Sequence, residues 1–274
     1  MLEIIIAAAV VGGVGILIGI FLGVSAEKFK VEVDEKEIKV REALPGNNCG
    51  GCGFAGCDAL AKAIAAGEAK VNACPVGGEP VAAAIAAILG VEAEEGQRLT
   101  AYVKCSGTCD KTKEMYIYSG VETCEAMMYM QNTGKKVCTF GCMGYGSCVK
   151  ACEFDAIHIV DGIAVVDEEK CKACGKCVAT CPKHLIELVP YKAPVKVACN
   201  SNDKGAVVKK GCETGCIGCM LCTKQCETGA ITVTNNLAHI DYDKCTGCGK
   251  CAEKCPVKVI KITGKVSEED AAEE

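Results

Sequence analysis

Apolar positions along this chain form one long uninterrupted run and several short alternating ones. Residues 4–24 contain no charged side chain, and as a helix they are long enough to cross a hydrocarbon layer about 30 Å thick. Residues 156–167 (AIHIVDGIAVVD) and 230–241 (AITVTNNLAHID) each alternate on both sides of a turn, which predicts two β-hairpins. The pattern predicts an α+β protein with a single transmembrane helix at its N-terminus.

The N-terminal run is predicted to be a retained membrane anchor, residues 1–25. Its glycines suit close packing against other helices in a membrane. The alternative is a secretory signal peptide cleaved near residues 24–26, but no basic residue precedes the run, and the apolar stretch is too long for such a peptide. Basic residues follow the run, so we expect a single-pass protein of the cell membrane whose C-terminal part is cytoplasmic.

Cysteine changes this picture most, with 25 copies among 274 residues. Two equally spaced runs stand before a proline, namely Cys171, Cys174, Cys177, Cys181 and Cys245, Cys248, Cys251, Cys255. This spacing is typical of bacterial ferredoxins that hold [4Fe-4S] clusters. The odd cysteine count argues against a disulfide framework, and a third cysteine crowded in at the same spacing fits a cubane better than a tetrahedral zinc ion.

Aromatic side chains, which normally dominate a core, are scarce, with 5 Phe, 7 Tyr and no Trp. We therefore expect the clusters to act as internal scaffolding. Because metal binding and folding share one free energy, loss of the iron should unfold the chain.

The first cysteine group is predicted to hold one [4Fe-4S] cluster on a small helical domain. Its members are Cys49, Cys52, Cys57 and Cys74. Asp58 is expected to cap a helix over residues 59–66, and a second helix is expected from Pro80 to Leu89. The alternative at this group is a zinc knuckle, because its spacing is less exclusive than the ferredoxin run.

An internal duplication covers residues 138–265. In two-cluster ferredoxins the fourth cysteine of each run ligates the other cluster, which assigns three sets of ligands: Cys171, Cys174, Cys177 with Cys152; Cys216, Cys219, Cys222 with Cys255; and Cys245, Cys248, Cys251 with Cys226. Aligning residues 138–152 on 212–226 puts Tyr145 where Cys219 stands, so Cys138 is the expected substitute. The remaining set is then Cys138, Cys142, Cys148 and Cys181.

Twenty cysteines are thereby placed in five clusters, which leaves Cys105, Cys109, Cys124, Cys199 and Cys212. We expect that Cys105, Cys109 and Cys124 can supply three ligands of a sixth cluster, with Cys199, Cys212 or Cys138 as the fourth. The alternative is that they are free buried thiols. Residues 101–109 faintly echo residues 195–203, which suggests that Cys105 and Cys199 hold equivalent places at the heads of the two repeats.

These modules predict the following organisation: anchor 1–25, charged stalk 26–45, helical [4Fe-4S] domain 46–95, cysteine-containing connecting segment 96–137, ferredoxin-like unit 1 138–192, ferredoxin-like unit 2 193–265 and acidic tail 266–274. There is no phosphate loop, dinucleotide fingerprint or nucleophile elbow, so we identify no catalytic residue and no site for an organic cofactor. The chain can pass single electrons.

The anchor, the stretch LPGNNCGGCGFAGCDALAKAI and the run VCTFGCMGYGSCVKACEFDAIHIVDGIAVVDEEKCKACGKC together resemble one family over almost the whole chain. This family is the B subunit of the Rnf complex, a membrane-bound ferredoxin:NAD+ oxidoreductase that couples electron transfer to sodium or proton translocation. The resemblance implies that the chain accepts electrons from reduced ferredoxin and relays them to other subunits, which hold the NAD and flavin sites. It also implies that the module at Cys49 is the handover site.

Two other interpretations remain open. One is an iron-sulfur subunit of a different membrane redox complex, such as a hydrogenase or a respiratory reductase, and the other is a metal scaffold without redox function. The formal net charge of -5 and the anionic clusters disfavour long-range attraction of an acidic ferredoxin. Docking is therefore expected to depend on local lysines, namely Lys172, Lys176, Lys183, Lys250, Lys254 and Lys258.

Overall fold

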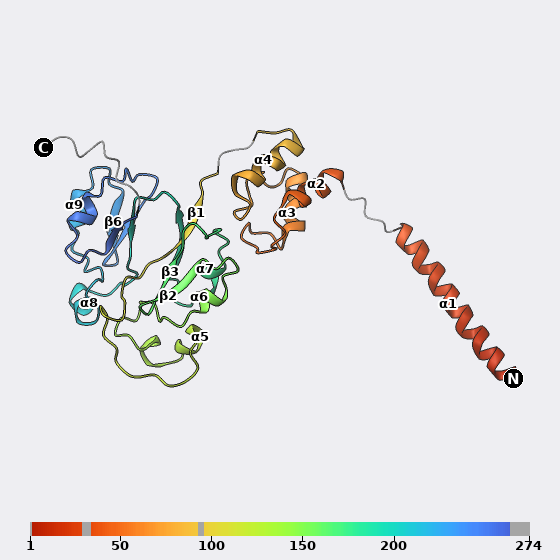
Figure 1. Cartoon of the computed structure of the whole chain (residues 1–274), viewed down its shortest axis with the longest axis horizontal. Helices are drawn as coiled ribbons and strands as arrows, with labels where there is room; N and C mark the ends of the chain where they lie inside the picture. Colours follow the sequence, from red (N-terminus) through yellow and green to blue (C-terminus); the bar gives the residue numbers. More distant parts are fainter. Residues whose placement is uncertain (1, 29–33, 93–95, 264–274) are drawn as a thin grey trace.

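The structure is a computed structural model that describes residues 2–28, 34–92 and 96–263. Its first element is a single continuous helix, α1 (Leu2–Lys28), at the N-terminal end of the chain (Figure 1). By length and apolar character together, no helix within the described residues qualifies as a membrane span, so the anchor remains a prediction. Part of the predicted stalk and the predicted acidic tail, 266–274, lie outside the described residues.

The helical module that follows has three helices, α2 (Glu35–Ala43), α3 (Cys57–Ala65) and α4 (Gly78–Leu89). Their apolar faces meet in a core in which Leu60 and Ile85 are fully buried. The two helices expected here are confirmed, but each begins two residues earlier than predicted.

Asp58 does not cap α3, because its carboxylate instead accepts a hydrogen bond from Arg41 Nε at 2.5 Å. Asn48 takes over the capping task through the amide of Cys57, at 2.8 Å. A residue that the sequence places in a loop therefore anchors the start of the cysteine-bearing helix.

Each ferredoxin unit contains a β-hairpin and a second two-stranded antiparallel sheet formed by the ends of the unit. The two hairpins are confirmed, as β2 (Ile157–Val160) with β3 (Ile163–Val166) and β6 (Ile231–Thr234) with β7 (Leu237–Ile240). The end sheets are β1 (Leu99–Val103) with β4 (Ile186–Pro190) and β5 (Val195–Val197) with β8 (Ile260–Ile262). The helices of the units are α6 (Ser147–Lys150), α7 (Lys176–Thr180), α8 (Gly205–Gly211), α9 (Leu221–Gln225) and α10 (Lys250–Glu253).

Unit 1 begins earlier along the chain than predicted. Strand β1 lies in the predicted connecting segment, yet Leu99 stands opposite Pro190 at the far end of the unit. A five-residue strand whose partner is about ninety residues away leaves no local signature, which is why the alternation pattern missed it. The remainder of the segment, residues 104–137, is a long insertion in unit 1 that we call the excursion. It contains α5 (Cys124–Met127) and a short 3-10 helix, η1 (Gln131–Thr133).

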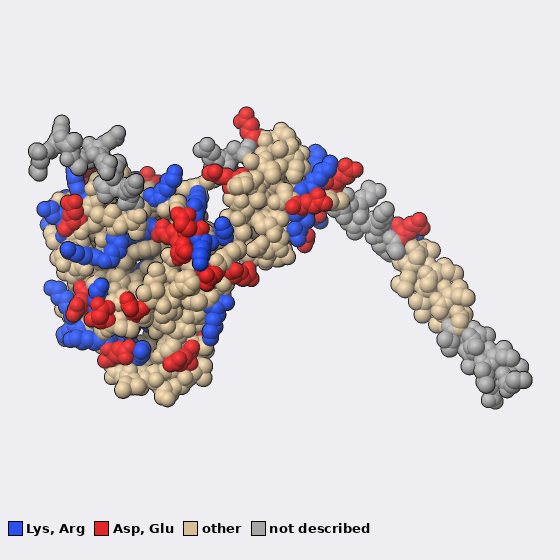
Figure 2. Space-filling view, viewed as in Figure 1, with Lys and Arg blue, Asp and Glu red and all other residues tan. Residues whose placement is uncertain are grey.

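A buried lysine joins the two units. Lys196 of β5 is completely buried, and its ammonium pairs with Glu168 Oε1 at 2.6 Å and lies 5.4 Å from the centre of the Tyr102 ring. On the face drawn in Figure 2, acidic and basic side chains are interspersed over the part of the molecule that contains the two units.

Candidate iron-sulfur sites

The N-terminal site, defined as Cys49, Cys52, Cys57 and Cys74, is assembled by the helical module. Cys57 opens α3, and both Cys57 and Cys74 are buried in the core against which Cys52 packs. Burial raises the pKa of the Cys74 thiol, and the nearby thiols of Cys57 and Cys49 raise it further. The structure therefore brings all four predicted residues into one neighbourhood.

The outer site of unit 1 comprises Cys152, Cys171, Cys174 and Cys177, which line one cavity as the crossing rule predicts. Backbone amides point at its sulfurs. The amide of Ala101 donates to Cys171 Sγ at 3.3 Å, and that of Ala156 donates to Cys152 Sγ at 3.4 Å. Such bonds stabilise thiolates, so the fold prepares these sulfurs to act as metal ligands.

The inner site of unit 1 differs from the predicted set. Cys142, Cys148 and Cys181 line a cavity with Cys124, whereas Cys138 lies elsewhere. The excursion explains this difference, because the amide of Cys124 donates to Ser147 Oγ at 3.1 Å and so docks the start of α5 on α6. Tertiary contact, and not spacing along the chain, selects Cys124.

The two sites of unit 2 follow the predicted grouping. Cys216, Cys219, Cys222 and Cys255 line the cavity of the inner site. At the outer site, burial raises the pKa of Cys251, the nearby Cys245 and Cys248 raise it further, and Cys226 packs against the same core. Burial hinders ionisation of Cys226, but hydrogen bonds from Thr228 and from backbone amides outweigh it and lower the pKa.

A sixth group of cysteines lies between the two units. Cys105, Cys138, Cys199 and Cys212 line one cavity, which we call the bridging site. The amide of Cys142 donates to Cys105 Sγ at 3.4 Å, and the amide of Cys216 donates to Cys199 Sγ at 3.3 Å. Each donor belongs to a neighbouring inner site, so the bridging site is in direct contact with both units.

The predicted sixth set is thereby regrouped. Cys105 lies in the bridging site and Cys124 in the inner site of unit 1, while Cys109 is exposed and belongs to neither. Cys109 lies against the hairpin turn of unit 1, where a side chain on Gly162 would collide with its sulfur. The six groups account for every cysteine of the chain except Cys109.

Without metal, the buried thiols of these sites resist ionisation. Burial and the neighbouring cysteines raise the pKa of Cys148 to about 12, and burial raises the pKa of Cys177, Cys199 and Cys251 to about 11. Metal ligation requires thiolates, so assembly of clusters at these sites must release protons.

The donor chemistry fits iron-sulfur clusters. Each of the six groups offers four sulfurs, which are the soft ligands that such clusters take, and amide donors lie close to several of them. No group of His, Cys, Asp and Glu side chains within the described ranges is gathered so as to hold a single metal ion.

The helical module meets unit 1 at the outer site. A side chain on Gly51 would lie 2.8 Å from the carbonyl oxygen of Cys174, so only glycine permits this approach. The thiol of Cys49 is near enough to raise the pKa of Cys174, after the larger effect of burial. The N-terminal site and the outer site of unit 1 are therefore neighbours.

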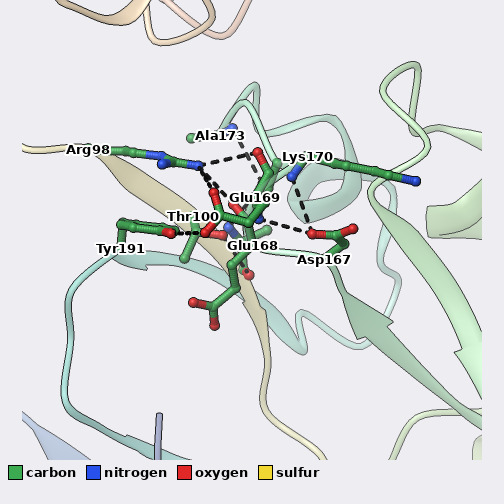
Figure 3. Close-up of polar contacts among 10 residues, drawn as sticks. Arg98, Thr100, Asp167, Glu168, Glu169, Lys170, Ala173 and Tyr191 are labelled. Carbon is green, nitrogen blue, oxygen red and sulfur yellow. Dashed lines mark hydrogen bonds and ion pairs between the residues drawn. The ribbon is translucent and has the colours of Figure 1, made fainter. Parts of the chain in front are cut away.

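A polar clamp formed by Arg98, Glu169 and Tyr191 holds the segment that leads into Cys171 (Figure 3). Arg98 Nη2 donates to the carbonyls of Glu168 and Glu169 at 3.1 and 3.3 Å, and the guanidinium lies 3.7 Å from the centre of the Tyr191 ring. The Tyr191 hydroxyl donates to the Glu169 carboxylate. No periodicity or spacing marks these residues, because they converge only in the folded unit.

Three family models match the chain. A model described as a putative Fe-S cluster matches residues 44–76, a 4Fe-4S binding domain matches residues 164–187, and a 4Fe-4S dicluster domain matches residues 215–259. These ranges contain the N-terminal site, most of unit 2 and the part of unit 1 that carries Cys171, Cys174, Cys177 and Cys181. All four cysteines of the bridging site lie outside them.

Curated relatives are similar over most of the chain. The B subunit of the Na(+)-translocating ferredoxin:NAD(+) oxidoreductase complex of Acetobacterium woodii is 47% identical, over 88% of this chain and 72% of the relative. The B subunit of the ion-translocating oxidoreductase complex of Methanosarcina acetivorans is 44% identical, over 86% and 89%. The B subunit of the proton-translocating ferredoxin:NAD(+) oxidoreductase complex of Clostridium ljungdahlii is 38% identical, over 83% and 81%.

Proposed function

The chain belongs to the family of B subunits of ion-translocating oxidoreductase (Rnf) complexes, and we propose that it relays single electrons from reduced soluble ferredoxin to other redox subunits of such a complex. The observation that carries this proposal is the arrangement of six groups of four cysteines, each in contact with the next. When bound, [4Fe-4S] clusters supply one-electron transfer at potentials that the surrounding protein adjusts. The chain itself positions these sites.

Contacts along the row support its continuity. From the helical module inward, Gly51 abuts Cys174, and the thiol of Cys177 adds to the raised pKa of Cys148 in the next site. From there, amide-to-sulfur bonds run between Cys142 and Cys105 and between Cys216 and Cys199. Helices α9 and α10, which carry ligands of the two sites of unit 2, then contact one another. No site stands apart from its neighbours.

We propose six clusters, with the bridging site as the connection between the units. Anaerobic preparations should contain about 24 iron atoms per chain, against about 20 if only five sites are filled. Replacing Cys138 by Ser should remove about four iron atoms. An unchanged iron content in this variant would remove the bridging site from the proposal.

The entry point for electrons is proposed to be unit 2. Cys219 and Cys248 are exposed, and Met220 and Leu221 form an exposed apolar edge beside Cys219. Of the lysines expected to guide docking, Lys250 pairs with Glu227 at 2.8 Å, and Lys254 is exposed.

The double variant Lys250→Glu, Lys254→Glu should slow reduction by ferredoxin several-fold and weaken its salt dependence. Reduction by dithionite serves as the control, because a small reductant needs no docking surface. Equal ferredoxin rates in variant and parent would place the entry point elsewhere.

The exit point is proposed to be the N-terminal site, held at the cytoplasmic face by an anchor in residues 1–25. The uncharged run at 4–24 and the position of the helical module next to it along the chain support this. Retention in membranes after carbonate extraction, with the cysteine modules cleaved by protease only in inside-out vesicles, is the expected result. Complete extraction by carbonate would exclude the anchor.

Partner composition separates this function from the alternative of a role in a hydrogenase or a respiratory reductase. A tagged chain purified from membranes should bring with it subunits that carry flavin and that oxidise or reduce NAD. Recovery with a hydrogenase instead would overturn the assignment to a ferredoxin:NAD+ oxidoreductase.

A further inference from the structure

Lys136 is a buried cation whose ammonium is held by backbone carbonyls. The residue is 4% exposed, and its ammonium donates to the carbonyl oxygens of Gly107 at 2.8 Å and Gly162 at 3.0 Å. Within the described parts of the chain, no carboxylate forms an ion pair with it. A buried charge is costly unless an opposite charge lies nearby, so an anion is expected beside this ammonium.

The surroundings of Lys136 indicate where that anion lies. Lys136 lines the bridging site together with its four cysteines. The alpha carbon of Gly107, whose carbonyl it binds, faces two of them, because a side chain there would lie 3.6 Å from Cys212 Sγ and 3.7 Å from Cys105 Sγ. Burial raises the pKa of Cys142 in the adjoining inner site, and the charge of Lys136 acts in the opposite direction.

Lys183 is a second lysine close to cysteines of the same two sites. Its ammonium donates to the carbonyl of Thr139 at 2.6 Å, and the residue lines the inner site of unit 1. Burial lowers the pKa of Lys183, while the thiols of Cys138, Cys142 and Cys105 act in the opposite direction. Lys183 too lacks an ion-pair partner among the described carboxylates.

We propose that Lys136 and Lys183 are fixed counter-charges that raise the reduction potentials of the bridging site and of the inner site of unit 1. The inference rests on the proposed function. A cluster with four thiolate ligands is anionic and becomes more so when it accepts an electron, so a nearby ammonium favours the reduced form. One electron leaves a neighbouring site and arrives at the bridging site, and neither lysine gains or loses a proton.

The position of the bridging site between the two units gives the two lysines a role in electron transfer. The bridging site receives one pair of cysteines from each repeat, and an electron held there lies between unit 2, where electrons enter, and unit 1, which leads to the N-terminal site. Raised potentials at these adjacent sites make transfer out of unit 2 favourable. They also hold the electron until the outer site of unit 1 can accept it.

The competing interpretation is that Lys136 has only a structural role, in which its two hydrogen bonds hold Gly107 against the hairpin turn at Gly162. The variants Lys136→Gln and Lys136→Arg separate the two, since glutamine keeps a donor but loses the charge, whereas arginine keeps the charge. Lys113→Gln is the matched control, because Lys113 lies on the same excursion but is exposed. The quantity measured is the midpoint potential of each cluster in the anaerobic full chain, determined by redox titration with magnetic resonance as the detector. The signal that disappears in Cys138→Ser is assigned to the bridging site.

Lys136→Gln should lower the ratio of reduced to oxidised bridging cluster at least tenfold at fixed poise, which equals a fall in midpoint potential of about 59 mV for one electron. Lys136→Arg should stay within a threefold change, and Lys113→Gln should not differ from the parent. An unshifted potential in Lys136→Gln, or equal shifts in the Gln and Arg variants, would overturn the role of Lys136.

If Lys136→Gln loses iron, its potential cannot be interpreted, and Lys183→Gln becomes the test. This variant should lower the ratio of reduced to oxidised cluster at the inner site of unit 1 at least tenfold. An unshifted potential there would overturn the proposal. Absence of all iron-sulfur signals from the parent chain would instead overturn the proposed function. Failure of the inference and failure of the function are therefore distinguishable.

Discussion

Replacing Gly51 by Ala should weaken the contact between the N-terminal site and the outer site of unit 1. The new Cβ would lie 2.8 Å from the carbonyl oxygen of Cys174 and 3.0 Å from its Cα, whereas ordinary contacts begin at 3.4 Å. The loop at Gly51 must therefore retreat by roughly 0.6 Å from backbone atoms that cannot rotate away. Overpacking of this kind costs about 1–3 kcal/mol, which shifts the docked population about 5- to 150-fold.

The assay is freeze-quenched reduction of the anaerobic full chain by ferredoxin, with the N-terminal signal identified by its loss in Cys74→Ser. Gly51→Ala should leave iron content and reduction of unit 2 unchanged while it slows reduction of the N-terminal site. Gly96→Ala is the matched control, because its Cβ would meet Asn72 at an ordinary 3.7 Å. If the N-terminal site is reduced equally fast in all three proteins, electrons do not reach it through the Gly51 contact.

Three further outcomes are expected. Cys109→Ser should retain the full iron content, because Cys109 belongs to none of the six groups, and a loss of about four iron atoms would contradict that grouping. Glu168→Ala should lower the free energy of unfolding by about 3 kcal/mol, because it leaves the buried Lys196 ammonium without its carboxylate partner. A loss below about 1 kcal/mol in denaturant titrations would contradict this. Chelation of the iron under reducing conditions should abolish cooperative thermal unfolding in circular dichroism, whereas a retained transition would show that the polypeptide core suffices.

Sequence patterns predicted the parts of the fold whose causes are local. Both hairpins follow from alternation around a turn, and three groups of cysteines follow from ferredoxin spacing combined with the crossing rule. The N-terminal group follows from its own, separate spacing. The excursion was beyond such rules, because Cys124 reaches its cavity only through the contact of α5 with Ser147. Lys136 and Lys183 could not be identified either, since burial beside sulfur is a property of the tertiary structure.

The bridging site did leave a trace in the sequence. The alignment of the repeats sets Cys138 on Cys212, and the weaker echo sets Cys105 on Cys199. Each repeat therefore offers two cysteines in equivalent places, and the structure brings the two pairs together. A rule that assigns ligands within single ferredoxin units cannot find a site that is shared between two of them.

The comparison of the repeats also explains why unit 1 recruits Cys124. Tyr145 stands where unit 2 has Cys219, and its ring packs edge-on against Tyr118 of the excursion, with centroids 6.2 Å apart. Cys219 lines the cavity of its own unit, so a cysteine at position 145 should lie at the corresponding point of unit 1.

Cys124→Ser should therefore lose about four iron atoms, and the double variant Cys124→Ser, Tyr145→Cys should regain them. Tyr145→Phe in the Cys124→Ser background controls for the change of the ring, and it should regain none. Iron and sulfide analysis of the four anaerobic proteins decides the matter. A double variant that stays four iron atoms short would show that the excursion has moved the backbone of unit 1 away from the geometry of unit 2.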